Sequence, residues 1–242
     1  MLARDWYYNQ RRQLGIDNAV AAICDRHSDS DVRARAALAA LGVKAGWKVA
    51  DIGCGNGVLA TEAALMGAEV DAVDISPAML ALADIYARDR KALIRTQPAG
   101  LLSFAYKPNS YDLIVSEFTL HHLPDFWKAV ALSRILAALK PGAHFYLRDI
   151  VFVSMPDGTE RDVEEWADFN IKNHDFSRDS VVTHMREDYS TFGWVIERML
   201  TETGFILVSA DYHAPLHGTY LLQKPKSNGQ GKATREPAKQ EQ

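Results

Sequence analysis

Two aspartates and a run of glycines supply the clearest chemical pattern in this chain. Asp51 ends a short apolar run, and three glycines follow it at alternate positions: Gly53, Gly55 and Gly57. Glycine allows backbone angles and close approaches that a side chain forbids, so such a loop lets the main chain lie against a ligand. A second acid, Asp74, ends the next apolar run about twenty residues later, the spacing at which a carboxylate binds the ribose of an adenosine cofactor.

The glycine spacing and Asp51 favour a cationic ligand over a dinucleotide. A dinucleotide fingerprint reads G-x-G-x-x-G and rests a pyrophosphate on the following helix, whereas the third glycine comes earlier here. A carboxylate at this point repels a pyrophosphate and attracts an ammonium group. S-adenosylmethionine (SAM) carries an ammonium, a sulfonium and no phosphate, so it suits Asp51 better. The alternatives are that Asp51 caps the next helix and that Asp74 caps the helix starting after Ser76.

Strands and helices alternate around these residues. Apolar runs predict strands ending at Asp51 and Asp74, and further strands over the segments 92–97, 111–116 and 143–151. Helices are predicted between them over the segments 58–66, 77–90 and 124–139. The second of these helices has Ser76 as its N-cap and Pro77 in its first turn. Alternation at this pace predicts a parallel sheet.

Three further segments are predicted outside the alternating pattern. Residues 1–45 are predicted to be helical, with an aromatic cluster at 6–8. Residues 152–190 are predicted to form a lid-like insertion, in which Thr159 and Asp162 form a capping box. A helix ending at Gly204 and two strands, 205–211 and 218–222, complete the main domain of residues 46–223. Residues 224–242 contain no large apolar side chain and are predicted to be a disordered tail.

Composition narrows the functional classes. The chain has 242 residues, 48% of them apolar, which is enough for one large domain with a solid core. A net charge of −4 gives no field that favours nucleic acid or an anionic membrane. No run of apolar residues is long enough for a membrane span, and no signal-peptide pattern is present. Two cysteines and no zinc-like Cys/His spacing predict no metal site. We expect a cytoplasmic monomer or homodimer that acts on a small molecule.

Segments 49–60, 70–80 and 111–124 resemble the first, second and fourth strand motifs of the class I SAM-dependent methyltransferases. The order and spacing extend over roughly residues 45 to 225. The resemblance implies an α/β, Rossmann-like sheet of about seven strands with helices on both faces. A helical N-terminal segment would precede this sheet, and the helical insertion would follow its fifth strand.

The resemblance also implies which residues hold the cofactor. The backbone of the loop glycines would lie under the methionine part of SAM, and Asp51 would attract its ammonium. Asp74 would accept hydrogen bonds from both ribose hydroxyls. Further cofactor contacts are implied for Ile75, Leu101 and Ser116. Many relatives place an acid after the third strand to hold the adenine, but this chain has Gln-Pro-Ala-Gly-Leu at 97–101, so the backbone near Leu101 is the expected contact.

Candidate catalytic residues follow the fourth and fifth strands. Methyl transfer is an in-line displacement that needs a base only when the nucleophile carries a proton. His122 is a candidate base because histidine titrates near neutrality, while the alternative is that His121 and His122 pack or cap a helix. Arg148 and Asp149 end the fifth strand, where open α/β sheets bind ligands. They form either an internal salt bridge or handles for a substrate, with Asp149 as a further catalytic candidate.

The insertion adds polar groups that would reach a pocket from above: His174, His184, Arg186, Tyr189 and Trp194. Tyr189 is a third catalytic candidate, and Arg186 beside it would bind an anionic substrate.

The leading functional hypothesis is a methyltransferase acting on oxygen, nitrogen, sulfur or carbon of a small molecule. One alternative is an enzyme of the same fold that breaks a different sulfonium bond, for example by aminocarboxypropyl transfer or cyclisation. Another is a non-catalytic SAM-binding module. DNA base methylation is disfavoured, because residues 116–124 lack the Asn/Asp-Pro-Pro-aromatic motif and no Pro-Cys nucleophile is present.

Overall fold

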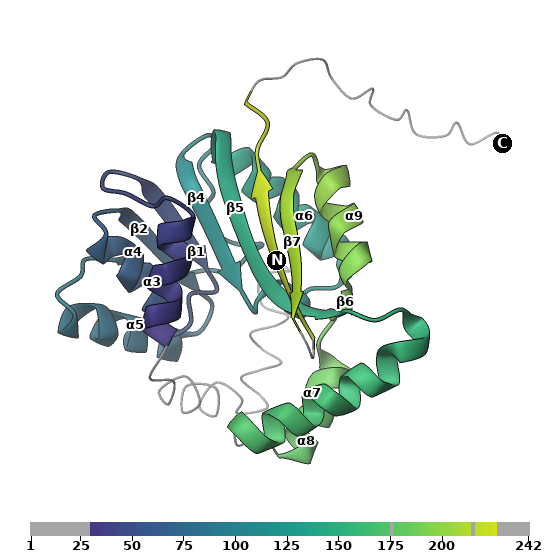
Figure 1. Cartoon of the computed structure of the whole chain (residues 1–242). Coiled ribbons are helices and arrows are strands. Elements are labelled where there is room, and N and C mark those ends of the chain that lie inside the picture. The colour runs from purple at the N-terminus through teal and green to yellow at the C-terminus, as the bar shows by residue number, and fades with distance from the viewer. Residues whose placement is uncertain (1–29, 175–176, 214–215, 227–242) are drawn as a thin grey trace, which may run out of the picture.

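A computed structural model describes residues 30–174, 177–213 and 216–226 (Figure 1). The predicted N-terminal helices before Ser30, with their aromatic cluster, lie outside the described residues. The predicted tail of residues 224–242 is wrong at its first residue, because the Lys224 amide donates to the Ala143 carbonyl at 2.9 Å. The rest of that tail, after Lys226, lies outside the described residues. No helix in the described part of the chain is both long and apolar enough to cross a bilayer.

A single sheet organises the described chain. Five strands run parallel in the order β3-β2-β1-β4-β5, and the antiparallel hairpin β8-β7 completes the edge beside β5. These strands are β1 (Lys48–Ile52), β2 (Glu69–Asp74), β3 (Arg95–Pro98), β4 (Tyr111–Glu117), β5 (Leu139–Phe152), β7 (Ile206–His213) and β8 (His217–Gln223). A short strand, β6 (Thr191–Phe192), pairs with the end of β5. The predicted α/β class I sheet is confirmed.

Helices cover both faces of the sheet (Figure 1). The helices α3 (Ser30–Ala40), α4 (Val58–Leu65) and α5 (Pro77–Asp89) lie on one face. The helices α6 (Asp125–Ala138) and α9 (Gly193–Thr203) lie on the other. The helix predicted over 58–66 ends at Leu65, shortly before Gly67, whose φ of 88° favours glycine. The predicted cap of α5 holds too, since the Ser76 hydroxyl accepts from the Met79 amide at 3.4 Å.

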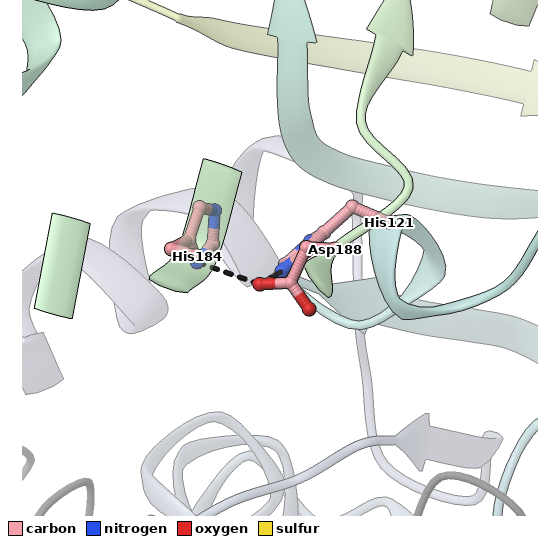
Figure 2. A group of neighbouring side chains, drawn as sticks. All are labelled: His121, His184 and Asp188. Carbon is pink, nitrogen blue, oxygen red and sulfur yellow. Dashed lines mark ion pairs between the residues drawn. The ribbon is translucent and has the colours of Figure 1, made fainter. Parts of the chain in front are cut away.

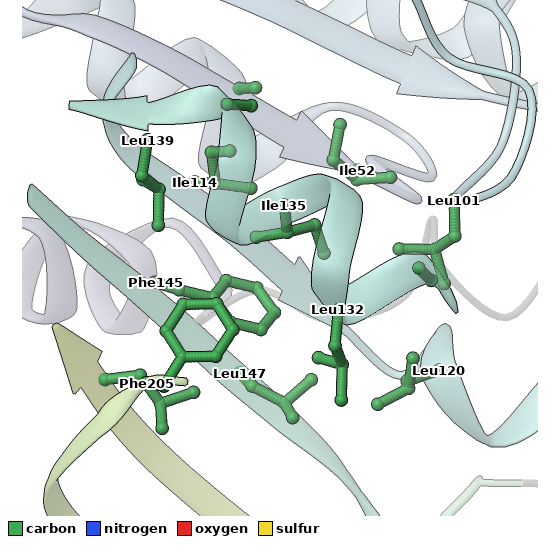
Figure 3. Close-up of a cluster of buried hydrophobic side chains, with 14 of the residues drawn as sticks. Ile52, Leu101, Ile114, Leu120, Leu132, Ile135, Leu139, Phe145, Leu147 and Phe205 are labelled. Carbon is green, nitrogen blue, oxygen red and sulfur yellow. The ribbon is translucent and has the colours of Figure 1, made fainter. Parts of the chain in front are cut away.

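A large apolar core fixes the sheet against α6 and α9 (Figure 3). Ile114 and Phe145 are fully buried in the centre of the sheet, and Leu132 and Ile135 reach them from α6. Burying side chains of this size stabilises the fold by about 1.5–3 kcal/mol each. The strands that carry the candidate site residues are therefore rigid.

Two elements differ from their predicted form. The fifth strand was predicted to begin at residue 143, but it begins at Leu139, which pairs with Tyr111. The Lys-Pro-Gly stretch at 140–142 is therefore an irregularity within the strand. The predicted capping box is wrong, because the Asp162 carboxylate accepts from the amide and hydroxyl of Ser154 at 2.9 and 2.8 Å.

The insertion after β5 forms a helical pair beside the sheet's lower end in Figure 1. A short 3-10 turn, η2 (Pro156–Gly158), leads into α7 (Thr159–His174), and α8 (Arg178–Glu187) follows. A small apolar cluster joins this pair to the sheet: Trp166 and Ala167 of α7 and Val181 of α8 pack with Ile150 and Leu216. The insertion is thus a packed element with its own core contacts.

Candidate functional site

The three loop glycines between β1 and α4 have different surroundings, although all have a positive φ. A Cβ at Gly53 would lie 2.0 Å from the hydroxyl of Thr119, and one at Gly57 would lie 2.6 Å from the Cβ of Ala83 in α5. A Cβ at Gly55 would meet no described residue within 4 Å. Two of the glycines therefore permit close packing within the protein, whereas Gly55 faces space that no described residue fills.

Asp51 is a buried carboxylate without a full set of partners. Its side chain is 3% exposed, and its Oδ2 has no hydrogen-bond partner among the described residues. Burial raises its pKa to about 8, helped by the nearby charges of Glu117 and Asp74, while a hydrogen bond from the Ala60 amide acts in the opposite direction. The bond to the first turn of α4 is the predicted capping alternative. Capping does not explain why Oδ2 of Asp51 lacks a hydrogen-bond partner among the described residues.

Asp74 connects the glycine loop to the start of the next helix. Its Oδ2 accepts from the Gly55 amide at 3.0 Å and its Oδ1 accepts from the Ser76 amide at 2.8 Å. The capping of α5 falls to the Ser76 side chain, so Asp74 is not the N-cap itself. These two bonds fix the Asp74 carboxylate beside the glycine loop.

The remaining predicted cofactor residues are placed at different depths. Ile75 is half-buried, and a Cβ at Gly100 would lie 2.6 Å from its Cγ2, so the two segments touch. The Leu101 side chain is buried in the main core, which leaves only its backbone for a ligand. Ser116 is fully buried and donates to the Ile52 carbonyl at 2.9 Å, so its hydroxyl ties β4 to β1.

A third carboxylate near the glycine loop was not singled out from the sequence. Glu117, the last residue of β4, raises the pKa of Asp51 by its charge. The guanidinium of Arg33 in α3 donates to both of its oxygens at 3.0 to 3.3 Å. These residues are far apart in the sequence, and no local pattern joins them.

Phe118 follows Glu117 with a strained backbone, at a φ of 51°. Its amide donates to the Arg148 carbonyl at 2.8 Å, and the Arg148 guanidinium lies 4.8 Å from the centre of its ring. Burial lowers the pKa of Arg148, although the charge of Glu117 partly offsets it. Of the two predicted alternatives, the internal salt bridge between Arg148 and Asp149 is therefore wrong. It stacks on Phe118, which itself packs against the cluster that joins the lid to the sheet.

Asp149 and the neighbouring histidine form a fully buried pair. Nδ1 of His121 bonds to Oδ1 of Asp149, and both side chains are less than 5% exposed. Oδ2 of Asp149 also accepts from the amides of Leu120 and His121, at 2.7 and 3.1 Å. Burial alone would raise the pKa of Asp149, but His121 and a hydrogen bond from the Ile150 amide outweigh it and lower the pKa. Asp149 therefore holds His121 in place.

His122 bonds to the lid. Its Nδ1 lies 2.8 Å from Oδ1 of Asp188, the residue that follows α8. Nδ1 of His184 lies 2.7 Å from the other oxygen of the same carboxylate (Figure 2). Burial alone would raise the pKa of Asp188, but the hydrogen bonds from His122 and His184 prevail and hold it well below its usual range. Asp188 was missed by the sequence analysis, since its partner at 122 is distant along the chain.

The other predicted lid residues have more modest environments. The Tyr189 amide donates to the His121 carbonyl at 2.7 Å, so its backbone joins the lid to the turn η1 (Leu120–His122), while its side chain is 37% exposed. Arg186 bonds to its neighbour Glu187 at 2.8 Å. It also lines a cavity of about 340 Å³, whose described lining residues come from α7 and α8. Trp194 is exposed and stacks on Phe192, and the His174 side chain lies outside the described residues.

Comparison with known proteins agrees with this geometry. Residues 49–142, which include the glycine loop, both aspartates and η1, match the family model described as a methyltransferase domain. The match covers less than half of the chain, and the described fold is that of the class I methyltransferases. Over 107 residues it is 32% identical to the ubiquinone biosynthesis O-methyltransferase of Cupriavidus pinatubonensis, covering 44% of this chain and 42% of that protein. The chain thus matches less than half the length of the curated relatives reported first.

Solved structures extend the likeness to the whole fold. The phosphoethanolamine N-methyltransferase 2 of Haemonchus contortus, in complex with SAM, superposes with a TM-score of 0.62 at 20% identity, covering 80% of this chain and 52% of that one. The [4+2]-cyclase SpnF superposes with a TM-score of 0.64 at 15% identity, covering 81% of each chain. One domain architecture therefore occurs in proteins named for different reactions, and the chemistry must be argued from the site.

Proposed function

We propose that the protein binds SAM at the β1–α4 loop and transfers its methyl group to a small molecule. The single observation that carries this proposal is the orphan Oδ2 of Asp51, buried beside an open glycine loop and two more carboxylates. A buried carboxylate without a partner is costly. A ligand with an ammonium and a sulfonium removes that cost, whereas a pyrophosphate would increase it.

The residues present fit SAM at three points. Asp51 meets the ammonium of the methionine part, and the bare backbone at Gly55 lets that part lie close to the loop. Asp74, fixed beside the loop by its bonds to the Gly55 and Ser76 amides, accepts from the ribose hydroxyls. Ile75 and the backbone at Leu101 form the adenine side. Ser116 supports the loop from below by its bond to the Ile52 carbonyl.

The acceptor is proposed to be a hydroxyl-bearing small molecule. A hydroxyl loses its proton during methyl transfer and so benefits from a general base. His122 is the proposed base, and the bond between its Nδ1 and Asp188 orients the ring. Asp149 is a positioning residue for His121. Arg148 and the lid residues Arg186 and Tyr189 are proposed to bound the substrate space. The name of the Cupriavidus relative, an O-methyltransferase, agrees with this choice.

Two measurements test the proposal. Calorimetry with SAM, S-adenosylhomocysteine and NAD separates the cofactor classes, and we expect binding of the first two alone. Mass spectrometry of reactions with hydroxylated acceptors then identifies the product. S-adenosylhomocysteine indicates methyl transfer, and methylthioadenosine indicates transfer of the aminocarboxypropyl arm. Binding of NAD in place of SAM contradicts the cofactor assignment, and SAM binding without turnover favours a non-catalytic module.

A further inference from the structure

The lid and the sheet meet at a compact group of metal-ligating side chains. His121 comes from η1 at the end of β4, while His184 lies in the last turn of α8 and Asp188 follows that helix. One ligand atom from each lies within 4.8 Å of the other two (Figure 2). His121 is buried, and the other two residues are partly buried. Two imidazoles and one carboxylate form a donor set typical of zinc and of non-haem iron sites.

Distances within the group suit a first-row divalent ion. Oδ2 of Asp188 lies 2.7 Å from Nδ1 of His184 and 3.9 Å from Nε2 of His121. Two ligands at Zn–N lengths of about 2.0–2.1 Å in tetrahedral geometry are roughly 3.3 Å apart. The two observed separations fall on either side of that value. Small side-chain rotations would therefore equalise them without movement of the helix.

The group also has the outer partners that metal ligands require. Nδ1 of His121 bonds to the Asp149 carboxylate, which directs Nε2 of the same ring toward Asp188. The second oxygen of Asp188 bonds to Nδ1 of His122 at 2.8 Å. The ring of His184 packs against Trp166, with the ring centres 4.8 Å apart. Carboxylate–histidine pairs of this kind orient the ligand and raise its basicity in known metal sites.

We propose that His121, His184 and Asp188 form a site for a divalent transition-metal ion that clamps the lid to the sheet. The inference does not depend on the proposed SAM binding, since none of the three residues belongs to the glycine loop. The charges suit such an ion, because the carboxylates of Asp188 and Asp149 balance its two positive charges. With only three protein ligands, the ion keeps a position for water or a substrate atom. The sequence concealed this site, since only the i,i+4 pair His184 and Asp188 is local.

The rival explanation is a set of ion pairs in which protonated histidines surround Asp188. A metal and a proton compete for the same nitrogen atoms, so direct metal binding separates the two explanations. The test uses full-length untagged protein, stripped with a chelator and then titrated with Zn²⁺ and separately with Co²⁺. We expect one equivalent of either ion per chain. The Co²⁺ form should show the visible d–d absorption of a low-coordinate site.

Two variants and one control locate the ion. His184→Ala and Asp188→Asn should each weaken Zn²⁺ binding at least tenfold. His144→Gln should leave it unchanged, because His144 lies at the other end of β5, where its ring contacts Gln223. Proteolysis of the 152–190 segment should slow when Zn²⁺ is added to the wild type. SAM binding by each variant serves as the folding control and reports on the cofactor site separately. Absence of stoichiometric binding of either ion, or binding that survives both substitutions, overturns the proposal.

Discussion

Replacing Asp51 with asparagine should change how the stability of the unliganded protein depends on pH. The carboxyl is fully enclosed, and burial raises its pKa to about 8 from an ordinary value of 3.8. Below pH 4 it is protonated in both the folded and unfolded states. Between pH 4 and 8 the unfolded chain releases this proton and the folded chain keeps it, so stability falls as the pH rises. Above pH 8 both states are ionised and the loss is complete.

The size of the effect follows from the same linkage. A group ionised in one state and protonated in the other changes the free energy of unfolding by roughly 1 kcal/mol for each pH unit. Asparagine has nearly the shape of aspartic acid and no proton to release. Urea unfolding followed by circular dichroism at pH 5, 6, 7 and 8 should therefore show Asp51→Asn gaining stability relative to the wild type at each step. Asp89→Asn is the matched control, since Asp89 is an exposed residue in the last turn of α5.

Saturating SAM should remove most of this pH dependence from the wild type. The ligand's fixed sulfonium charge favours the ionised carboxylate, so the pKa of Asp51 falls when SAM is bound. The variant should bind SAM more weakly and show no such change. If the stability curves of wild type and Asp51→Asn stay parallel from pH 5 to 8, Asp51 is not a buried neutral acid. The unpartnered Oδ2 of Asp51 would then give no support for a cationic ligand.

Four further substitutions test the other roles. Asp74→Ala should weaken SAM binding by tenfold or more, if about 1.5–3 kcal/mol comes from charge-assisted hydrogen bonds; unchanged affinity in calorimetry would contradict the ribose role. His122→Gln should lower kcat by about 10²- to 10⁴-fold at unchanged SAM affinity, and a normal kcat would remove it as the base. Gly57→Ala should destabilise the fold because its Cβ would overlap Ala83, whereas Gly55→Ala should mainly weaken SAM binding. Thermal melts measure the first effect and calorimetry the second. Equal losses of melting temperature in the two variants would refute the distinction.

The fold was predictable because its signals are local. The strand Glu69–Asp74 and the helix starting at Pro77 were found where the apolar run, the Ser76 cap and Pro77 placed them. The third strand was the weakest match, predicted over 92–97 and found at Arg95–Pro98. It lies at the edge of the sheet and its side chains are only partly buried, so its apolar pattern is faint.

The contacts between the site residues were harder to predict from the sequence than the fold. The glycines look alike in the sequence, but their roles depend on Thr119 and Ala83, which arrive from later segments. The pairing of Asp188 with His122 spans 66 positions along the chain. Thr159 and Asp162 have the spacing of a capping box, but Ser154 competes for the carboxylate from the preceding loop. Local spacing cannot record contacts that the tertiary fold creates.

The carboxylates near the glycine loop and the carboxylate near the lid have different partners. Near the glycine loop, Glu117 is neutralised by Arg33 within the protein, while Asp51 has an oxygen that no described residue satisfies. Near the lid, Asp188 receives two imidazoles and its pKa stays low. The Asp51 carboxylate is therefore stabilised most by a cation that binds and dissociates, as a cofactor consumed in each turnover must. The carboxylate near the lid suits a permanent contact, and it joins the lid to the sheet end where the methyl acceptor is proposed to bind.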